Sequence, residues 1–156
     1  MFKRFFSYYK PYMGLFILDF SCAVLAALLE LSFPLAISKV MDDLLPNGDW
    51  EAIWFWGSLL LILYVISSTM HYVVTYFGHK LGINIETDMR NQLFSHVQRM
   101  SFRFFDQKKT GKLVSRMTND LMDIGEMAHH GPEDLFIAIM TLTGAFGLML
   151  SINWQL

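Results

Sequence analysis

The residues of this sequence with the most chemical interest are two carboxyl groups set among apolar side chains. Asp19 and Glu30 are eleven positions apart in a mostly apolar stretch. At about 100° per residue, this spacing puts them within about 20° of each other on one helical face. Ionisable groups in such a stretch usually face a cavity or the interior of a helix bundle. One hypothesis makes them candidates to line a path for a cationic or amphipathic substrate. The alternative is that both lie near the ends of a tilted helix or pair with polar groups on other helices.

The histidines are the next candidates, and their spacing argues against a metal site. His129 and His130 are adjacent, so on a helix they point about 100° apart and do not form an i, i+4 ligand pair. His71 and His79 are eight positions apart, without a nearby cysteine or carboxylate cluster at ligand spacing. We therefore expect surface histidines at 129 and 130, and no bound metal.

Nucleotide binding and catalysis within this chain are also not expected. Residues 110–112 read Thr-Gly-Lys, which is like the end of a phosphate-binding loop, but the first glycine of that loop is missing and Leu113 replaces the hydroxyl that would bind magnesium. No Ser, His and Asp arrangement has a recognisable motif spacing. A net charge of -2 gives no case for nucleic acid. The chain by itself is predicted to be neither an enzyme nor a cofactor-binding protein.

The composition predicts that these residues are positioned by membrane helices. Hydrophobic residues make up 54% of the chain and charged residues 17%. The apolar residues form blocks at 12–37, 52–77 and 134–152. The first block has about 26 residues and would be roughly 39 Å long as a helix, enough to cross a hydrocarbon core of about 30 Å with some tilt. We predict an all-α protein with three transmembrane helices, and a short polar loop at 39–51 between the first two.

The segment 78–131 is predicted to be a long helical hairpin outside the lipid. After Phe77 no proline occurs until Pro132, so the second spanning helix should continue. Two amphipathic runs follow, interrupted at a phenylalanine-rich tip at about 101–109. The apolar stripe of the first run is Leu81, Ile85, Met89, Leu93, Val97 and Met100. The stripe of the second run is Leu113, Met117, Leu121, Ile124 and Ala128. Gly131 and Pro132 interrupt the pattern as the chain returns toward the lipid.

Charge placement predicts the orientation. Residues 1–10 have the pattern of a short interfacial helix. Three Lys or Arg residues precede the first span, one lies near the first loop, and eight fall between Lys80 and Arg116. The positive-inside rule then places the N-terminus and the hairpin in the cytoplasm of a multi-pass cell-membrane protein. A cleaved signal peptide is less consistent with so long an apolar run. Three helices would leave polar interfaces facing lipid, so we expect the chain to be part of a larger protein.

Three motifs in the hairpin carry a family resemblance. They are residues 89–94 (MRNQLF), 100–106 (MSFRFFD) and 110–120 (TGKLVSRMTND). This pattern resembles R-x-x-L-F, FFD and TG-x-L-x-SR-x-x-ND in the first intracellular loop of ABC exporters of the multidrug and lipid-flippase type. The resemblance covers essentially the whole chain. One departure is Ser101, where many relatives have proline, which bears on how the tip helix starts.

The resemblance implies a function for the tip. It would be a coupling helix that docks on a cytoplasmic nucleotide-binding domain absent from this chain. The residues carried over are Phe102, Arg103, Phe104, Phe105, Asp106 and Gln107. The parent protein would bind ATP and Mg²⁺ and would pair two copies of the transmembrane domain, as a homodimer or a heterodimer. A plainer interpretation has Phe104 and Phe105 close the core of the hairpin itself. A different class of function also stays open, a membrane sensor or scaffold with a signalling hairpin.

Overall fold

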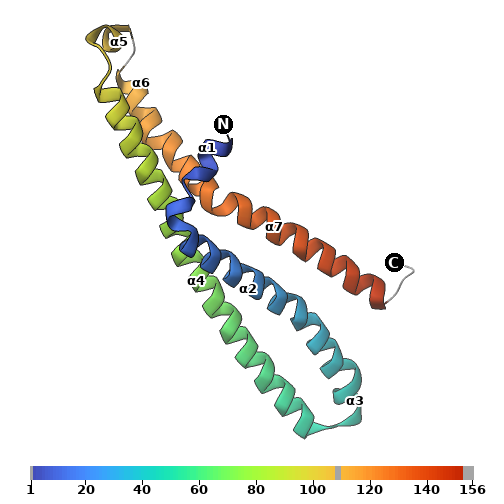
Figure 1. Cartoon of the computed structure of the whole chain (residues 1–156). Helices are drawn as coiled ribbons and strands as arrows, with labels where there is room; N and C mark the ends of the chain where they lie inside the picture. The colour runs from blue at the N-terminus through green and yellow to red at the C-terminus, as the bar shows by residue number, and fades with distance from the viewer. Residues whose placement is uncertain (1, 108–109, 153–156) are drawn as a thin grey trace. The chain divides into compact units, whose positions relative to one another are not determined.

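A computed structural model describes residues 2–107 and 110–152, and every element in these ranges is helical (Figure 1). The described residues contain no strand, so the all-α prediction is confirmed. The elements, in chain order, are α1 (Phe2–Ser7), η1 (Lys10–Tyr12), α2 (Met13–Lys39), η2 (Val40–Leu44), α3 (Leu45–Asn47), α4 (Trp50–Gln98), α5 (Phe102–Gln107), α6 (Thr110–Ser115), η3 (Arg116–Asp120) and α7 (Leu121–Ile152).

Among the described residues, three continuous helical stretches are long and apolar enough to cross a membrane. They are Lys10–Asn47, Trp50–Gln98 and Thr110–Ser151. The first two contain the predicted spans 12–37 and 52–77, and the third contains all but the last residue of the predicted span 134–152. Because backbone groups in lipid must be bonded within the segment, such stretches are stable there only as helices.

The connection between the first two spans is shorter than predicted. The loop expected at 39–51 is helical through η2 and α3, and the helix ends only at Gly48, whose φ of 64° is left-handed. Polar side chains support the extra turns, because Ser38 Oγ donates to Asp42 at 2.6 Å and Asn47 Nδ2 donates to the Asp43 carbonyl at 2.7 Å. The polar residues that predicted a loop therefore extend the helix by their side-chain hydrogen bonds, and Gly48 caps its end.

The predicted continuation of the second span is confirmed. α4 has 49 residues without a break, which corresponds to roughly 74 Å of helix, about two and a half times what the hydrocarbon core of about 30 Å requires. Pro132 lies inside α7, so the interruption expected there is a proline within a continuous helix.

The chain divides into two compact units, and the helices α2, α4 and α7 each contribute residues to both. One unit contains residues 1–18 and 76–132, and the other contains residues 19–75 and 133–156. We call the first the arm unit and the second the span unit. In the arm unit the buried residues Tyr9, Leu81, Ile85 and Ala128 form the core, and Leu81 and Ile85 are fully buried. The predicted stripes therefore face each other.

Small residues allow close packing in the span unit. Ala23, Ala26 and Ala27 are buried on α2. A Cβ at Gly144 of α7 would lie 2.7 Å from Leu31 Cδ1, so α7 approaches α2 closely there. Helices in lipid associate mainly through such packing. Many large apolar side chains of this unit are exposed, as expected for surfaces that meet lipid or further helices.

Candidate functional site

The helix α5 lies at the predicted tip and presents one phenylalanine outward. Phe102 is 90% exposed, whereas Phe104 and Phe105 are half-buried and contact each other edge to face, with ring centroids 5.4 Å apart. Arg103 and Asp106 are exposed. The side chain of Gln107 and residues 108–109 of the predicted tip lie outside the described part of the chain. The rings of Phe104 and Phe105 thus contact each other, and the ring of Phe102 stays exposed.

The body of the arm unit is a tightly packed antiparallel helix pair. A Cβ on Gly82 of α4 would lie 2.7 Å from the carbonyl oxygen of Gly125 in α7. At Gly78 the neighbour is a side chain, because a Cβ there would overlap the ring of His129. At both positions the absence of a side chain permits the contact.

Arg90 connects two of the three motifs. Its guanidinium donates to the Glu86 carboxylate one turn earlier on α4, and its Nε donates to the Met117 carbonyl at 3.3 Å. Met117 is in η3, the π-helical segment within the TG-x-L-x-SR-x-x-ND motif. A π-helical turn rearranges the regular i→i−4 bonding, and such turns often occur at functional positions. The arginine of the first motif therefore holds the backbone of the third.

The N-terminal segment is attached to the arm by tyrosine hydroxyls. Tyr8 Oη donates to Gln92 Oε1 at 2.8 Å, and Tyr12 Oη donates to Asp88 Oδ2 at 2.9 Å. The two acceptors are one helical turn apart on α4, so the two bonds lie along one face.

Tyr9 reaches the other helix of the arm. Its ring is 5% exposed, and its hydroxyl donates to the carbonyl oxygen of Ala128 in α7 at 2.6 Å. Burial raises the pKa of the phenol to about 12, because the charged phenolate would lose hydration. The segment 8–12 thus bonds to both helices of the arm.

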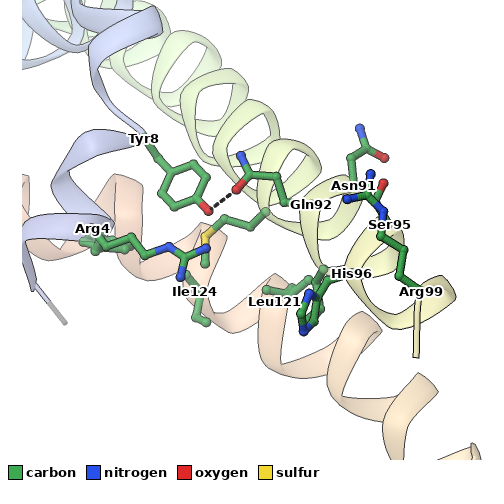
Figure 2. A pocket seen from close by; sticks show the side chains of 12 residues that line it. Arg4, Tyr8, Asn91, Gln92, Ser95, His96, Arg99, Leu121 and Ile124 are labelled. Atoms are coloured by element: carbon green, nitrogen blue, oxygen red, sulfur yellow. Dashed lines mark hydrogen bonds between the residues drawn. The ribbon is translucent and has the colours of Figure 1, made fainter. Parts of the chain in front are cut away.

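A cavity of about 940 Å³ lies beside this attachment (Figure 2). Its basic lining comes from Arg4 and Arg99, with the imidazole of His96 beside them, and its apolar lining includes Leu121 and Ile124. Tyr8 and its bond to Gln92 form part of the wall (Figure 2). The N-terminal segment therefore borders a hollow with basic residues in its lining, next to the bond between Tyr8 and Gln92.

The two carboxyl groups predicted for the substrate path have different surroundings. Asp19 is 2% exposed, and one of its carboxylate oxygens lies within 4.8 Å of a carboxylate oxygen of Glu133, which is also buried. The side chain of Glu30 is 56% exposed, and Oε1 lies 2.8 Å from Nε2 of His71 on α4. The two acids therefore have different neighbours: Asp19 lies beside Glu133 of α7, and Glu30 pairs with His71 of α4.

The sequence pattern did not predict either neighbour, Glu133 or His71. Glu133 follows Pro132 directly, and the pattern alone placed it outside the third span. The spacing of His71 and His79 bears on metal ligation alone and does not indicate a carboxylate partner for His71. Glu133 borders the apolar block 134–152 and His71 lies within the block 52–77, and an ionisable group in or beside an apolar block is the signal that could have found them.

The expectation of surface histidines is wrong for His129. It is 4% exposed, because the Gly78 surface of α4 accepts its ring, whereas His130 is exposed as predicted. His79 also lies beside these two residues, with its ring centroid 5.2 Å from that of His129. Pairing of the helices brings the three rings together, which spacing within one helix could not reveal.

Comparison with known proteins gives a consistent family. The model of the family called the ABC transporter transmembrane region matches residues 16–156. The chain is 60% identical to the uncharacterized ABC transporter ATP-binding protein YwjA of Bacillus subtilis, over 100% of this chain and 27% of that protein. It is 29% identical to an ATP-dependent lipid A-core flippase of Idiomarina loihiensis, over 99% and 27% respectively. It is 22% identical to the putative multidrug export ATP-binding/permease protein YgaD of B. subtilis, over 99% and 28%. The chain spans about a quarter of the length of these relatives.

Proposed function

Because the chain belongs to the ABC transporter transmembrane region family, we propose that it forms the N-terminal part of the permease of an ATP-driven exporter. ATP and Mg²⁺ would be bound by a nucleotide-binding domain outside this chain. The observation that carries the proposal is the exposed Phe102 on α5, which follows the unbroken helix α4. The family match favours this interpretation over the sensor alternative.

In this proposal α5 docks on the nucleotide-binding domain. Phe102 is 90% exposed, and burying an apolar ring of this size in a partner is favourable. Aromatic anchors that enter a pocket supply much of the energy of protein interfaces. The exposed Arg103 and Asp106 would form the polar rim. Phe104 and Phe105 would brace the short helix from within by their edge-to-face contact.

The arm would transmit movement of the docked tip. α4 is one helix from Trp50 to Gln98, and close contact at Gly82 and Gly125 leaves little room for it to slide against α7. The bonds of Arg90 and Tyr9 join the arm helices to each other and to the N-terminal segment. A packed pair of this kind responds to force as a rigid body, which suits an alternating-access transporter.

The span unit would contribute to the substrate pathway. Asp19 and Glu30 are the candidate residues on α2, and buried or bundle-facing acids in a membrane segment would attract cationic groups. The N-terminus would lie in the cytoplasm, as the distribution of Lys and Arg predicts. A second copy of the domain, identical or related, would complete the pathway and cover apolar surface now exposed.

The docking step is tested by hydrogen–deuterium exchange on the full-length transporter in lipid nanodiscs. We expect Phe102→Ala to speed amide exchange in residues 102–107 at least about tenfold, because a lost anchor weakens an interface by about 1.4 kcal/mol or more. Phe94→Ala is the matched control, because Phe94 is also exposed but lies on the body of the arm. Equal exchange at the tip in the wild type and in Phe102→Ala would refute docking through this residue.

A further inference from the structure

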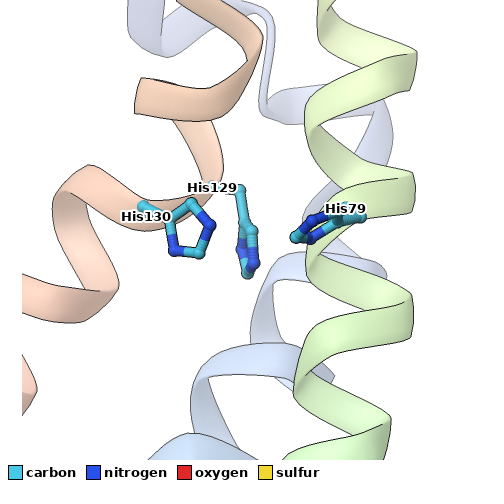
Figure 3. Close-up of side chains that lie close together, drawn as sticks. All are labelled: His79, His129 and His130. Carbon is cyan, nitrogen blue, oxygen red and sulfur yellow. The ribbon is translucent and has the colours of Figure 1, made fainter.

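Three imidazole rings from two helices meet in the arm unit. His79 is on α4, and His129 and His130 are on α7 (Figure 3). One ring nitrogen of each residue lies within 4.8 Å of the corresponding nitrogens of the other two. The ring centroids are 5.2 Å apart for His79 and His129, and 4.3 Å apart for His129 and His130. The cluster takes no part in the function proposed above.

The fold gives this cluster one fixed member and two accessible ones. His129 is 4% exposed and packs on Gly78, where a Cβ would come within 1.8 Å of its Cε1 atom. His79 and His130 are exposed. A buried ring held against backbone is already oriented, and exposed neighbours can rotate toward a ligand without disturbing the core.

The chemistry of this donor set suits a transition metal. We propose that His79, His129 and His130 bind a divalent transition-metal ion, represented by Zn²⁺, with water in the remaining coordination position. Three imidazoles with one open position are an established zinc arrangement, and an all-nitrogen set selects Zn²⁺, Ni²⁺ or Cu²⁺ over Mg²⁺ and Ca²⁺.

The required adjustment is small. Zinc–nitrogen bonds of about 2.0–2.1 Å at tetrahedral angles put ligand nitrogens about 3.3 Å apart, so nitrogens now within 4.8 Å close by side-chain rotation. Glu126 Oε2 lies 3.7 Å from His130 Nε2, one turn earlier on α7. A carboxylate near a ligating histidine orients the ring and raises its basicity.

A bound ion would link α4 to α7 in the arm. The two helices already meet at Gly78 and Gly82, and coordination would add a bond-like connection beside that contact. Because an ion that binds only the folded arrangement stabilises it, the metal would raise the melting temperature of the protein.

The test uses the full-length protein in nanodiscs, purified with a tag that lacks histidine. Zn²⁺ affinity is measured by competition with a chromogenic chelator, and Co²⁺ is added as a spectroscopic probe of the ligand set. We expect one Zn²⁺ per chain, a visible Co²⁺ absorption band typical of four-coordinate nitrogen ligation, and a higher melting temperature with Zn²⁺. Absence of stoichiometric Zn²⁺ binding would overturn the proposal.

Three variants separate this site from adventitious binding. His79→Ala removes an exposed ring and should weaken Zn²⁺ binding at least tenfold and abolish the Co²⁺ band. Gly78→Ala keeps all three histidines but displaces His129, and should weaken binding similarly. His96→Ala removes another exposed histidine of α4 and should change nothing. Unchanged affinity in His79→Ala, or an equal loss in His96→Ala, would rule the site out.

Discussion

Tyr9 donates a hydrogen bond of 2.6 Å to the carbonyl oxygen of Ala128, four residues before Pro132. In an α-helix the carbonyl of residue 128 accepts from the amide of residue 132, and proline has no amide hydrogen. The phenol therefore replaces the one helical bond that Pro132 removes from α7. The N-terminal segment completes a helix more than a hundred residues away, which explains how α7 runs through its proline without ending.

Removing this hydroxyl should destabilise the arm. Tyr9→Phe would leave a buried carbonyl without its donor, at a cost of about 1–3 kcal/mol. The measurement is amide exchange of residues 121–131 in the full-length protein, which should speed up accordingly. Tyr64→Phe is the control, because Tyr64 is 64% exposed, and it should stay within about 0.5 kcal/mol of the wild type. Equal protection in both variants would mean that the bond contributes nothing.

The same bond should depend on pH in the alkaline range. The phenol donates only when protonated, and its pKa rises from 10.0 to about 12 in the folded protein. The stabilisation is therefore fully present below pH 10 and is lost as the pH rises through about 12. Ultraviolet titration of tyrosinate should show a component near pH 12 that is missing from Tyr9→Phe. A difference between the two proteins centred at the ordinary tyrosine value would contradict burial of this ring.

Gly82→Ala should destabilise the arm, although alanine is the better helix former. A Cβ there would meet the Gly125 carbonyl oxygen at 2.7 Å, so the helices must separate. We expect a net loss of about 1–3 kcal/mol, which exceeds the gain of about 1 kcal/mol in helix propensity. Gly111→Ala, with nothing within 4 Å of its Cβ, should cause no loss. Thermal unfolding of the full-length protein measures both, and a stabilised Gly82→Ala would show that the helices do not pack closely.

Glu30→Gln tests the proposed substrate pathway. The substitution removes the charge of a side chain that pairs with His71, while keeping a group that can hydrogen-bond. We expect ATP hydrolysis stimulated by cationic amphipathic compounds to fall by about tenfold or more in proteoliposomes. The melting temperature should change little, because even a fully charged pair of exposed side chains contributes only about 0–1 kcal/mol. Asp42→Asn is a control in the connection between the spans. If ATP hydrolysis in Glu30→Gln is stimulated as strongly as in the wild type, Glu30 is not part of the substrate pathway.

Much of the fold followed from local patterns in the sequence. Apolar blocks of spanning length predicted three membrane helices, because lipid requires backbone bonds within the segment. The absence of proline between Phe77 and Pro132 predicted that α4 continues beyond the second span, and the stripes containing Leu81 and Ala128 predicted which faces of the arm pack together. These features depend on neighbours along one chain segment, so spacing alone reveals them.

The sites depended on pairing between segments, which spacing does not encode. The partners of Tyr9, Asp19 and Glu30 lie between 41 and 119 positions away along the chain. The three histidines looked unrelated because two are adjacent and the third is 50 residues distant. Sequence by itself determined that this is a helical membrane protein with a long arm and a phenylalanine-rich tip. Only the tertiary structure decided which polar groups meet, because that depends on which helices approach closely enough, here at glycines whose missing side chains set the distance.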